Sequence, residues 1–244
     1  MWQAATPVRQ PGSAVWHVNL EATAPIVAGM AAWLSADEAA RADRFLRRED
    51  RDRFIRSHQA LRYILAGYLD RSPEAVRFRI GPHGKPELDV PDQDALHFNL
   101  SHSGRHALIG VADGISIGVD VEAIRPFGDP MAVARAHFHP GEIADLARLS
   151  GAAQEAAFFA CWTRKEAVVK ALGTGLSFPL DRFRVALPPA DPAVLRWEGA
   201  GEPTPEWTIH HLDPGVDAVG AVAIAQVCEP CIRYRLPPDW AEAA

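Results

Sequence analysis

The chain has 244 residues, of which 48% are hydrophobic and 23% are charged, a composition typical of a folded globular protein rather than of a disordered, collagen-like or coiled-coil chain. Its 25 basic and 31 acidic residues give a formal net charge of −6, which argues against a general nucleic-acid-binding protein. No apolar segment approaches the ~20 residues that span a bilayer, no signal-peptide pattern begins the chain, and three cysteines are too few for a disulfide framework. We therefore expect a cytoplasmic protein that binds neither nucleic acid nor membranes.

The first half of the chain is predicted to contain a strand, two helices and three further strands. In chain order, we expect a strand at 15–20, helices at 35–48 and 54–68, and strands at 77–80, 96–101 and 107–111. The first helix begins at a capping box, in which Ser35 precedes Glu38 by three residues.

The second half repeats this order. We expect a strand at 115–121, a helical region at 140–172, and strands near Phe183, Trp207 and Val222. Arg77-Phe-Arg-Ile80 recurs as Arg182-Phe-Arg-Val185, 105 residues later, and the initial strands are offset by 100 residues. These landmarks predict an α+β fold of two similar α/β halves, residues 1–113 and 114–244, with a ligand site in the cleft between them.

Three acidic residues and a lysine form the first candidate site. Asp120 and Glu122 lie on one face of the strand predicted at 115–121, about 6.5 Å apart along it, and can converge on one hard cation. Glu166 and Lys170 lie on one stripe of the predicted helix 158–172, where Glu166 would supply a third carboxylate and Lys170 would face the bound anion. Such a trio suits Mg²⁺. A solvated strand edge and a surface Glu–Lys pair remain the alternatives.

Two further segments are suited to binding phosphate. Asn99-Leu-Ser-His-Ser-Gly104 is not a Ser–His hydrolase motif, because the adjacent Ser101 and His102 point to opposite faces of a strand and no strand-turn-helix elbow surrounds them. Eight arginines against four acids between Arg41 and Arg62 give a local charge of +4. The alternative for the arginines is a solvated helix face with internal ion pairs.

Taken in order, four motifs resemble the signature set of the larger, Sfp-type 4′-phosphopantetheinyl transferases. They are Gly84-Lys85-Pro86, Phe98-Asn-Leu-Ser-His-Ser-Gly104, Gly118-Val-Asp-Val-Glu122, and Trp162-Thr-Arg-Lys-Glu-Ala167 with Lys170. The resemblance implies the pseudo-twofold fold of that family, with nucleotide and phosphate binding in the first half and the metal site and catalytic helix in the second. It also implies transfer of the phosphopantetheine arm of coenzyme A to a serine of an apo acyl or peptidyl carrier protein, the reaction of a holo-[acyl-carrier-protein] synthase, with release of adenosine 3′,5′-bisphosphate.

The resemblance further implies roles for individual residues. Asp120, Glu122 and Glu166 would hold Mg²⁺ or Mn²⁺, Glu166 would help remove the serine proton, and Lys170 would neutralise the leaving phosphate. The implied coenzyme A contacts are Arg41, Arg53, Gly84, Lys85, Pro86, Asn99, Ser101, His102, Lys165 and Lys170, with Arg48 and Arg62 as further candidates for the 3′-phosphate. A chain that already contains two halves is expected to be a monomer. A metal-dependent phosphohydrolase acting on coenzyme A-like pyrophosphates and a non-catalytic binding module remain alternatives.

Overall fold

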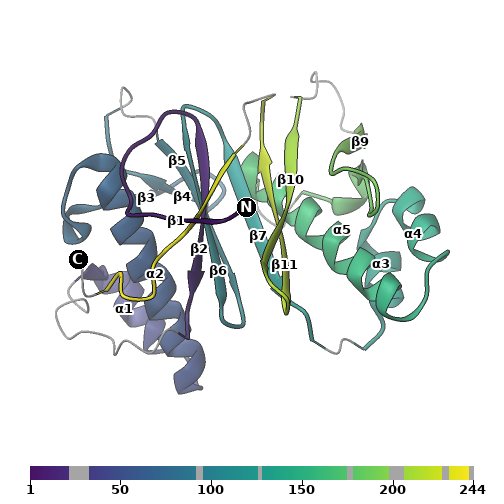
Figure 1. Ribbon diagram of the computed structural model, residues 1–244, viewed down its shortest axis with the longest axis horizontal. Helices are drawn as coiled ribbons and strands as arrows, with labels where there is room; N and C mark the ends of the chain where they lie inside the picture. The colour runs from purple at the N-terminus through teal and green to yellow at the C-terminus, as the bar shows by residue number, and fades with distance from the viewer. Residues whose placement is uncertain are drawn as a thin grey trace.

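Two β-sheets pack face to face, and a long helix covers the outer face of each. The computed structural model describes residues 1–21, 33–91, 96–125, 128–174, 178–197, 206–226 and 231–241. The layers run helix, sheet, sheet, helix (Figure 1), with one apolar core between the sheets and another under each helix layer. The predicted α+β class is confirmed. None of the helices in the described residues is both long and apolar enough to cross a membrane.

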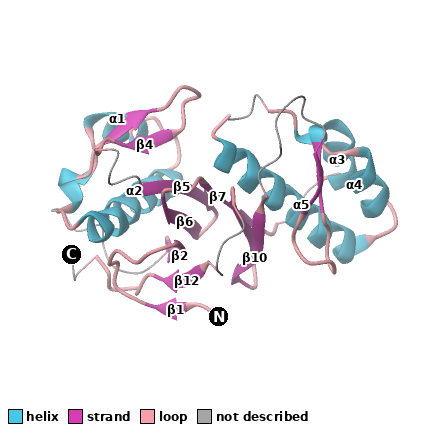
Figure 2. Ribbon diagram, turned by 90° about the horizontal axis from the view of Figure 1, so that it is seen from above, coloured by secondary structure: helices cyan, strands magenta, loops and turns pink. Residues whose placement is uncertain are grey.

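The first sheet has five strands. Their order is β1 (Gln3–Ala4), β12 (Ile232–Arg235), β2 (Ser13–Asn19), β6 (His106–Asp113) and β5 (Leu96–Ser103) (Figure 2). β2, β6 and β5 are antiparallel neighbours, whereas β12 runs parallel to β2 and β1 runs parallel to β12. Helices α1 (Ala36–Ala42) and α2 (Arg48–Leu69) belong to this half, where α2 buries Ile64 and Leu65 in the same core as Trp16 of β2. A 3₁₀ turn (Pro73–Ala75) and the hairpin of β3 (Phe78–Ile80) and β4 (Pro86–Leu88) connect α2 to β5.

The second sheet has three antiparallel strands in the order β10 (Thr208–Gly215), β11 (Ala218–Ile224) and β7 (Ile117–Ala123). Three helices follow β7: α3 (Pro130–His137), α4 (Pro140–Leu146) and α5 (Gly151–Leu172). A 3₁₀ turn (Leu180–Arg182) and the hairpin of β8 (Phe183–Val185) and β9 (Val194–Trp197) then lead to β10. Helix α5 packs on β7 and β11 and buries Phe158, Val168 and Val169.

The two halves share one topology. The order β2-β6-β5 in the first sheet matches β7-β11-β10 in the second, and each half carries one long helix and one small hairpin in the same chain positions. The repeated Arg-Phe-Arg segments supply β3 and β8, the first strands of those two hairpins. The boundary near residue 113 stays a prediction with one amendment: β12 pairs with β2, and Tyr234 and Trp240 are buried in the first core, so residues 231–241 pack with the first half.

Two predicted helices differ from those observed. The helix expected at 35–48 has the capping box at Ser35 but ends at Ala42, and Phe45 in the following turn contacts the ring of Phe54 in α2. The helical region expected at 140–172 is divided into α4 and α5, because Gly151 adopts a positive φ of 56° at the start of α5. Helix α3 was not predicted.

Candidate active site

Strand β7 separates apolar from acidic side chains. Ile117, Val119 and Val121 are buried in the core between the sheets. Because side chains alternate along a strand, Asp120 and Glu122 lie on its other face, as predicted.

Gly118 allows α5, the helix predicted to carry Glu166 and Lys170, to approach this acidic face. A Cβ atom at Gly118 would lie 2.1 Å from the carbonyl oxygen of Ala167, so no other residue fits at this position without displacing α5. The close packing of α5 on β7 brings Glu166 and Lys170 to the same side as Asp120.

Asp120 lies at the centre of the resulting cluster. Its Oδ1 accepts hydrogen bonds from Lys170 Nζ at 2.6 Å and Ser101 Oγ at 2.9 Å. Its Oδ2 is buried and has no hydrogen-bond partner among the described residues. Burial raises the pKa of Asp120, and the ammonium group of Lys170 opposes that rise. A buried carboxylate oxygen without a donor is suited to a cation.

The pKa values of the other two carboxylates, Glu122 and Glu166, are raised as well. Burial raises the pKa of Glu122 and of Glu166, and repulsion from Asp120 raises both further. Within the described ranges, no three acidic, histidine or cysteine side chains already form a closed metal-binding group. Mg²⁺ needs only part of its ligand set from the protein, since it retains waters and binds substrate phosphates. These three carboxylates, which include the unpartnered Oδ2 of Asp120, therefore fit Mg²⁺ or Mn²⁺.

Strand β5 contacts this cluster from the first half. The side chains of Asn99, Ser101 and Ser103 accept hydrogen bonds from the backbone N–H groups of β7 at Val119 (2.9 Å), Val121 (3.4 Å) and Ala123 (3.1 Å). Ser103 also donates to Glu122 Oε2 at 2.8 Å. Sequence analysis did not identify Ser103, although its spacing of two from Ser101 places both on one strand face.

A cavity of about 560 Å³ lies between β5 and the helices α1 and α2, and Arg41, His58, His102 and Lys170 are among its lining residues. Ser101 and His102 are adjacent on β5, so their side chains leave opposite faces of the strand. Both nevertheless line this cavity, and Ser101 also contacts β7. Burial lowers the pKa of His102, and the positive charges of Lys170, Arg41 and Arg53 lower it further. Two of these cationic side chains, Arg41 and Lys170, line the cavity together with His102, an arrangement suited to a phosphate.

Arg41 and Arg53, the two arginines predicted to bind the 3′-phosphate, have different surroundings. The guanidinium group of Arg41 lies 5.3 Å from the ring centroid of Phe54 at the cavity wall, and Arg53 forms ion pairs with Glu21 (3.1 Å) and Asp50 (3.6 Å).

Arg48 and Arg62, like Arg53, are not among the residues that line the cavity, and the partners of Arg48 and Arg62 correct their candidacy for the 3′-phosphate. The side chain of Arg48 is 92% exposed beside Asp52 on the outer surface of α2. Arg62 is buried and bonds to the capping-box residue Glu38 at 2.8 Å and to the Val76 carbonyl at 2.8 Å. Its role in this structure is to connect α2 to α1.

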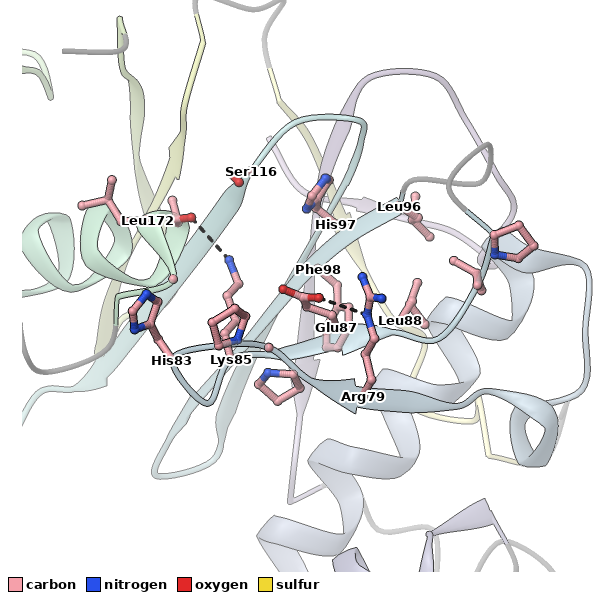
Figure 3. A pocket seen from close by; sticks show the side chains of 17 residues that line it. Arg79, His83, Lys85, Glu87, Leu88, Leu96, His97, Phe98, Ser116 and Leu172 are labelled. Carbon is pink, nitrogen blue, oxygen red and sulfur yellow. Dashed lines mark hydrogen bonds and ion pairs between the residues drawn. The ribbon is translucent and has the colours of Figure 1, made fainter. Parts of the chain in front are cut away.

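Lys85 and Pro86 line a second cavity of about 370 Å³, which shares Pro86 and Phe98 with the first (Figure 3). Gly84 occupies the turn before β4 with a φ of +82°. The ammonium group of Lys85 points at the end of α5, where it donates to the carbonyl of Lys170 at 2.7 Å. Burial lowers the pKa of Lys85 to about 8. Lys85 therefore connects the first half to the end of α5 that carries Lys170.

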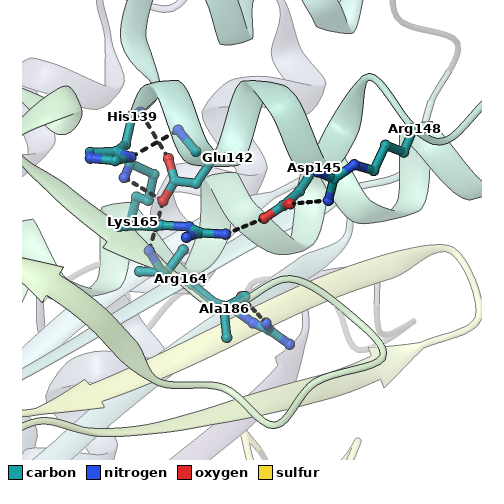
Figure 4. Close-up of polar contacts among 10 residues, drawn as sticks. His139, Glu142, Asp145, Arg148, Arg164, Lys165 and Ala186 are labelled. Carbon is teal, nitrogen blue, oxygen red and sulfur yellow. Dashed lines mark hydrogen bonds and ion pairs between the residues drawn. The ribbon is translucent and has the colours of Figure 1, made fainter.

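Lys165 points away from the carboxylate cluster. Its side chain is 0% exposed and bonds to Glu142 Oε1 at 2.8 Å and to the Phe183 carbonyl at 2.5 Å (Figure 4). The expectation that Lys165 assists at the phosphates is corrected, because its one cation is already paired within the core of the second half.

Comparisons with known proteins identify one family throughout. A sequence model of the 4′-phosphopantetheinyl transferase superfamily matches residues 116–227, and a model of the 4′-phosphopantetheinyl transferase N-terminal region matches residues 21–113. The 4′-phosphopantetheinyl transferase HetI of Nostoc sp. is 39% identical over 212 residues, which cover 86% of each chain. A 4′-phosphopantetheinyl transferase of Bacillus subtilis is 34% identical over 168 residues, 67% of this chain and 72% of the relative. The 4′-phosphopantetheinyl transferase Sfp of Bacillus subtilis strain 168 is 32% identical over 155 residues, 64% of this chain and 67% of the relative.

Proposed function

Since the chain belongs to the 4′-phosphopantetheinyl transferase superfamily, we propose that it transfers the phosphopantetheine arm of coenzyme A to a serine of an apo acyl or peptidyl carrier protein. The observation that carries this proposal is the contact of Lys170 with Asp120 and Ser101, which joins the two halves beside two further carboxylates. In the reaction, the serine Oγ–P bond forms, the bond from phosphorus to adenosine 3′,5′-bisphosphate breaks, and the serine loses its proton.

Asp120, Glu122 and Glu166 are proposed to hold Mg²⁺ or Mn²⁺. When bound, such a cation neutralises charge on the pyrophosphate of coenzyme A. Without it, three carboxylates whose repulsion already raises the pKa of Glu122 and Glu166 would also repel that pyrophosphate. We therefore expect activity to depend on a divalent cation.

Glu166 and Lys170 are the proposed catalytic pair beside Asp120. Burial raises the pKa of Glu166, which suits a carboxylate that accepts the serine proton. Lys170 Nζ lies 2.6 Å from Asp120 at the edge of the larger cavity, where its charge can stabilise the leaving phosphate.

Coenzyme A is proposed to occupy the two adjoining cavities. The positive charge of Arg41, which lines the larger cavity with His102, supports a 3′-phosphate site there, and Arg53, whose charge also lowers the pKa of His102, is proposed to assist. Gly84 and Pro86 would line the adenine, with Asn99 and Ser101 near the phosphates. We further propose that the chain acts as a cytoplasmic monomer, because both halves that form the site belong to one chain.

The decisive experiment incubates the protein with coenzyme A, Mg²⁺ and an apo carrier protein, and measures the intact mass of the carrier. We expect the wild type to add the mass of one phosphopantetheine arm to the carrier. The Asp120→Asn variant should add none, and the wild type should add none after chelation with EDTA. Asp181→Asn, which alters an exposed acid of the same half, is the matched control and should retain transfer.

The same assay separates the rival functions. Free phosphopantetheine with no gain in carrier mass would identify a phosphohydrolase. The absence of both free phosphopantetheine and modified carrier would identify a binding module. Transfer by Asp120→Asn at the wild-type rate would exclude the proposed metal site.

A further inference from the structure

Besides the apolar core between the sheets, polar side chains join the edge strands β5 and β7 at a place where backbone pairing would be expected. β5 is the edge strand of the first sheet and β7 is the edge strand of the second. An edge strand has a row of backbone N–H groups that need acceptors. On β7, three of these groups are satisfied by Asn99, Ser101 and Ser103 at 2.9, 3.4 and 3.1 Å. We refer to these three β5 residues as the side-chain ladder.

The members of the ladder differ in what they can donate. A serine hydroxyl that accepts one hydrogen bond still has its own O–H to donate, whereas the amide oxygen of Asn99 can only accept. Ser101 donates to Asp120 Oδ1 at 2.9 Å, and Ser103 donates to Glu122 Oε2 at 2.8 Å. Each serine therefore connects a β7 backbone N–H group to a β7 carboxylate.

Ser103 is the more informative of the two serines. Ser101 also accepts from Lys170 at 3.0 Å, so its replacement would disturb the proposed catalytic lysine as well. Ser103 contacts Glu122 alone among the proposed site residues, and its hydrogen bond lowers the pKa of Glu122 against the effects of burial and of Asp120.

We propose that Ser103 is a positioning residue that fixes the Glu122 carboxylate for a divalent cation and couples its orientation to the packing of the two halves. The inference rests on the proposed function in assigning Glu122 to the cation. Removing the hydroxyl releases Glu122 to other rotamers, and the cation then has to order it on binding. Hydrogen-bond partners of metal ligands typically contribute about 10- to 100-fold to metal affinity.

The test compares variants by Mn²⁺ binding, followed as the loss of the free Mn²⁺ signal in electron paramagnetic resonance with neither coenzyme A nor carrier present. We expect Ser103→Ala to weaken Mn²⁺ binding by about 10- to 100-fold. Ser103→Thr keeps a hydroxyl and should restore most of the affinity. Urea denaturation of each variant reports the loss of the contact between the halves.

Arg105→Ala is the matched control, because it removes another contact between the two halves, the 2.9 Å ion pair with Asp217, without touching a carboxylate of the proposed metal site. It should lower the urea midpoint while leaving the Mn²⁺ affinity at the wild-type value. Wild-type Mn²⁺ affinity in Ser103→Ala, or no Mn²⁺ binding by the wild type, would overturn the inference. A wild type that binds Mn²⁺ but modifies no carrier would reject the proposed function and leave the role of Ser103 to be decided by the same affinities.

Discussion

Arginines on one basic segment contact different partners, and the partner decides what each one contributes. Arg62 is buried against Glu38, Arg48 is solvated beside Asp52, and Arg41 lies at the wall of the larger cavity near His102. The local charge that makes the segment conspicuous in the sequence is therefore divided between a structural contact, a surface pair and a candidate phosphate site.

Arg41→Ala should reduce the preference for coenzyme A over 3′-dephospho-coenzyme A. Charge-assisted hydrogen bonds to the 3′-phosphate are expected to contribute about 1.5–3 kcal/mol, so the wild type should prefer coenzyme A by about 10- to 100-fold. Calorimetric titration of both ligands measures this preference, and Arg48→Ala is the control that should keep it. An equal loss with both ligands and a higher KM for the carrier would instead assign Arg41 to carrier docking.

At the scale of elements, a buried ion pair connects α4, α5 and β8. Glu142 Oε1 accepts hydrogen bonds from Lys165 Nζ and from the backbone N–H of Val185, both within 2.8 Å, and Lys165 also bonds to the Phe183 carbonyl. The aromatic ring of Phe183 lies 4.1 Å from the same ammonium group. These contacts hold the small hairpin of the second half against its helices.

Lys165→Met should destabilise the protein by about 3–5 kcal/mol, because it leaves the Glu142 carboxylate buried without its cation. Urea denaturation measures this loss, and Arg148→Ala, which breaks an exposed pair with Asp145, should change the midpoint little. The transfer rate per folded molecule should stay near the wild-type value. A lower transfer rate with an unchanged urea midpoint in Lys165→Met would instead indicate that Lys165 acts at the phosphates.

Local patterns account for the elements that the sequence predicted well. The alternation around Asp120 and Glu122 identified their shared strand face, and the four-residue spacing of Glu166 and Lys170 identified their stripe on α5. The side chain of Lys165, adjacent to Glu166, was misassigned because its partner Glu142 lies 23 residues away on another helix. Ser103 was missed for a related reason: its significance depends on β7 lying beside β5, which no periodicity within β5 reveals.

At the scale of the whole molecule, a chain of hydrogen bonds links the first sheet to the second. His17 Nε2 of β2 lies 3.0 Å from His106 Nδ1 of β6, and His106 Nε2 lies 3.1 Å from the carboxylate of Asp217, in the turn between β10 and β11. Burial, reinforced by the neighbouring His106, lowers the pKa of His17 to about 3. His17 is therefore neutral in the folded protein throughout the physiological range.

Stability should fall as the pH decreases from about 6.5, the ordinary pKa of histidine, toward 3. In that window the unfolded chain binds a proton at residue 17 and the native state does not, so acid favours unfolding. Urea midpoints measured between about pH 7.5 and about pH 4.5 report this slope. His17→Gln should flatten it, whereas His137→Gln, at an exposed position, should not. An unchanged slope in His17→Gln would assign the acid sensitivity to other groups.

The pairing of β12 with β2 has a consequence for how the protein is made on the ribosome. β12 begins at Ile232 and pairs with a strand that ends at Asn19, so this edge of β2 stays unpaired until residues 20–232 have been translated. At elongation rates of ~5–20 residues per second, that interval is on the order of 10–40 s. During it, the nascent β2 presents an unpaired edge that can add a strand from a neighbouring chain. Closely spaced ribosomes on one message would hold several such edges together, so slow translation or truncation before residue 232 should favour aggregation of the nascent protein.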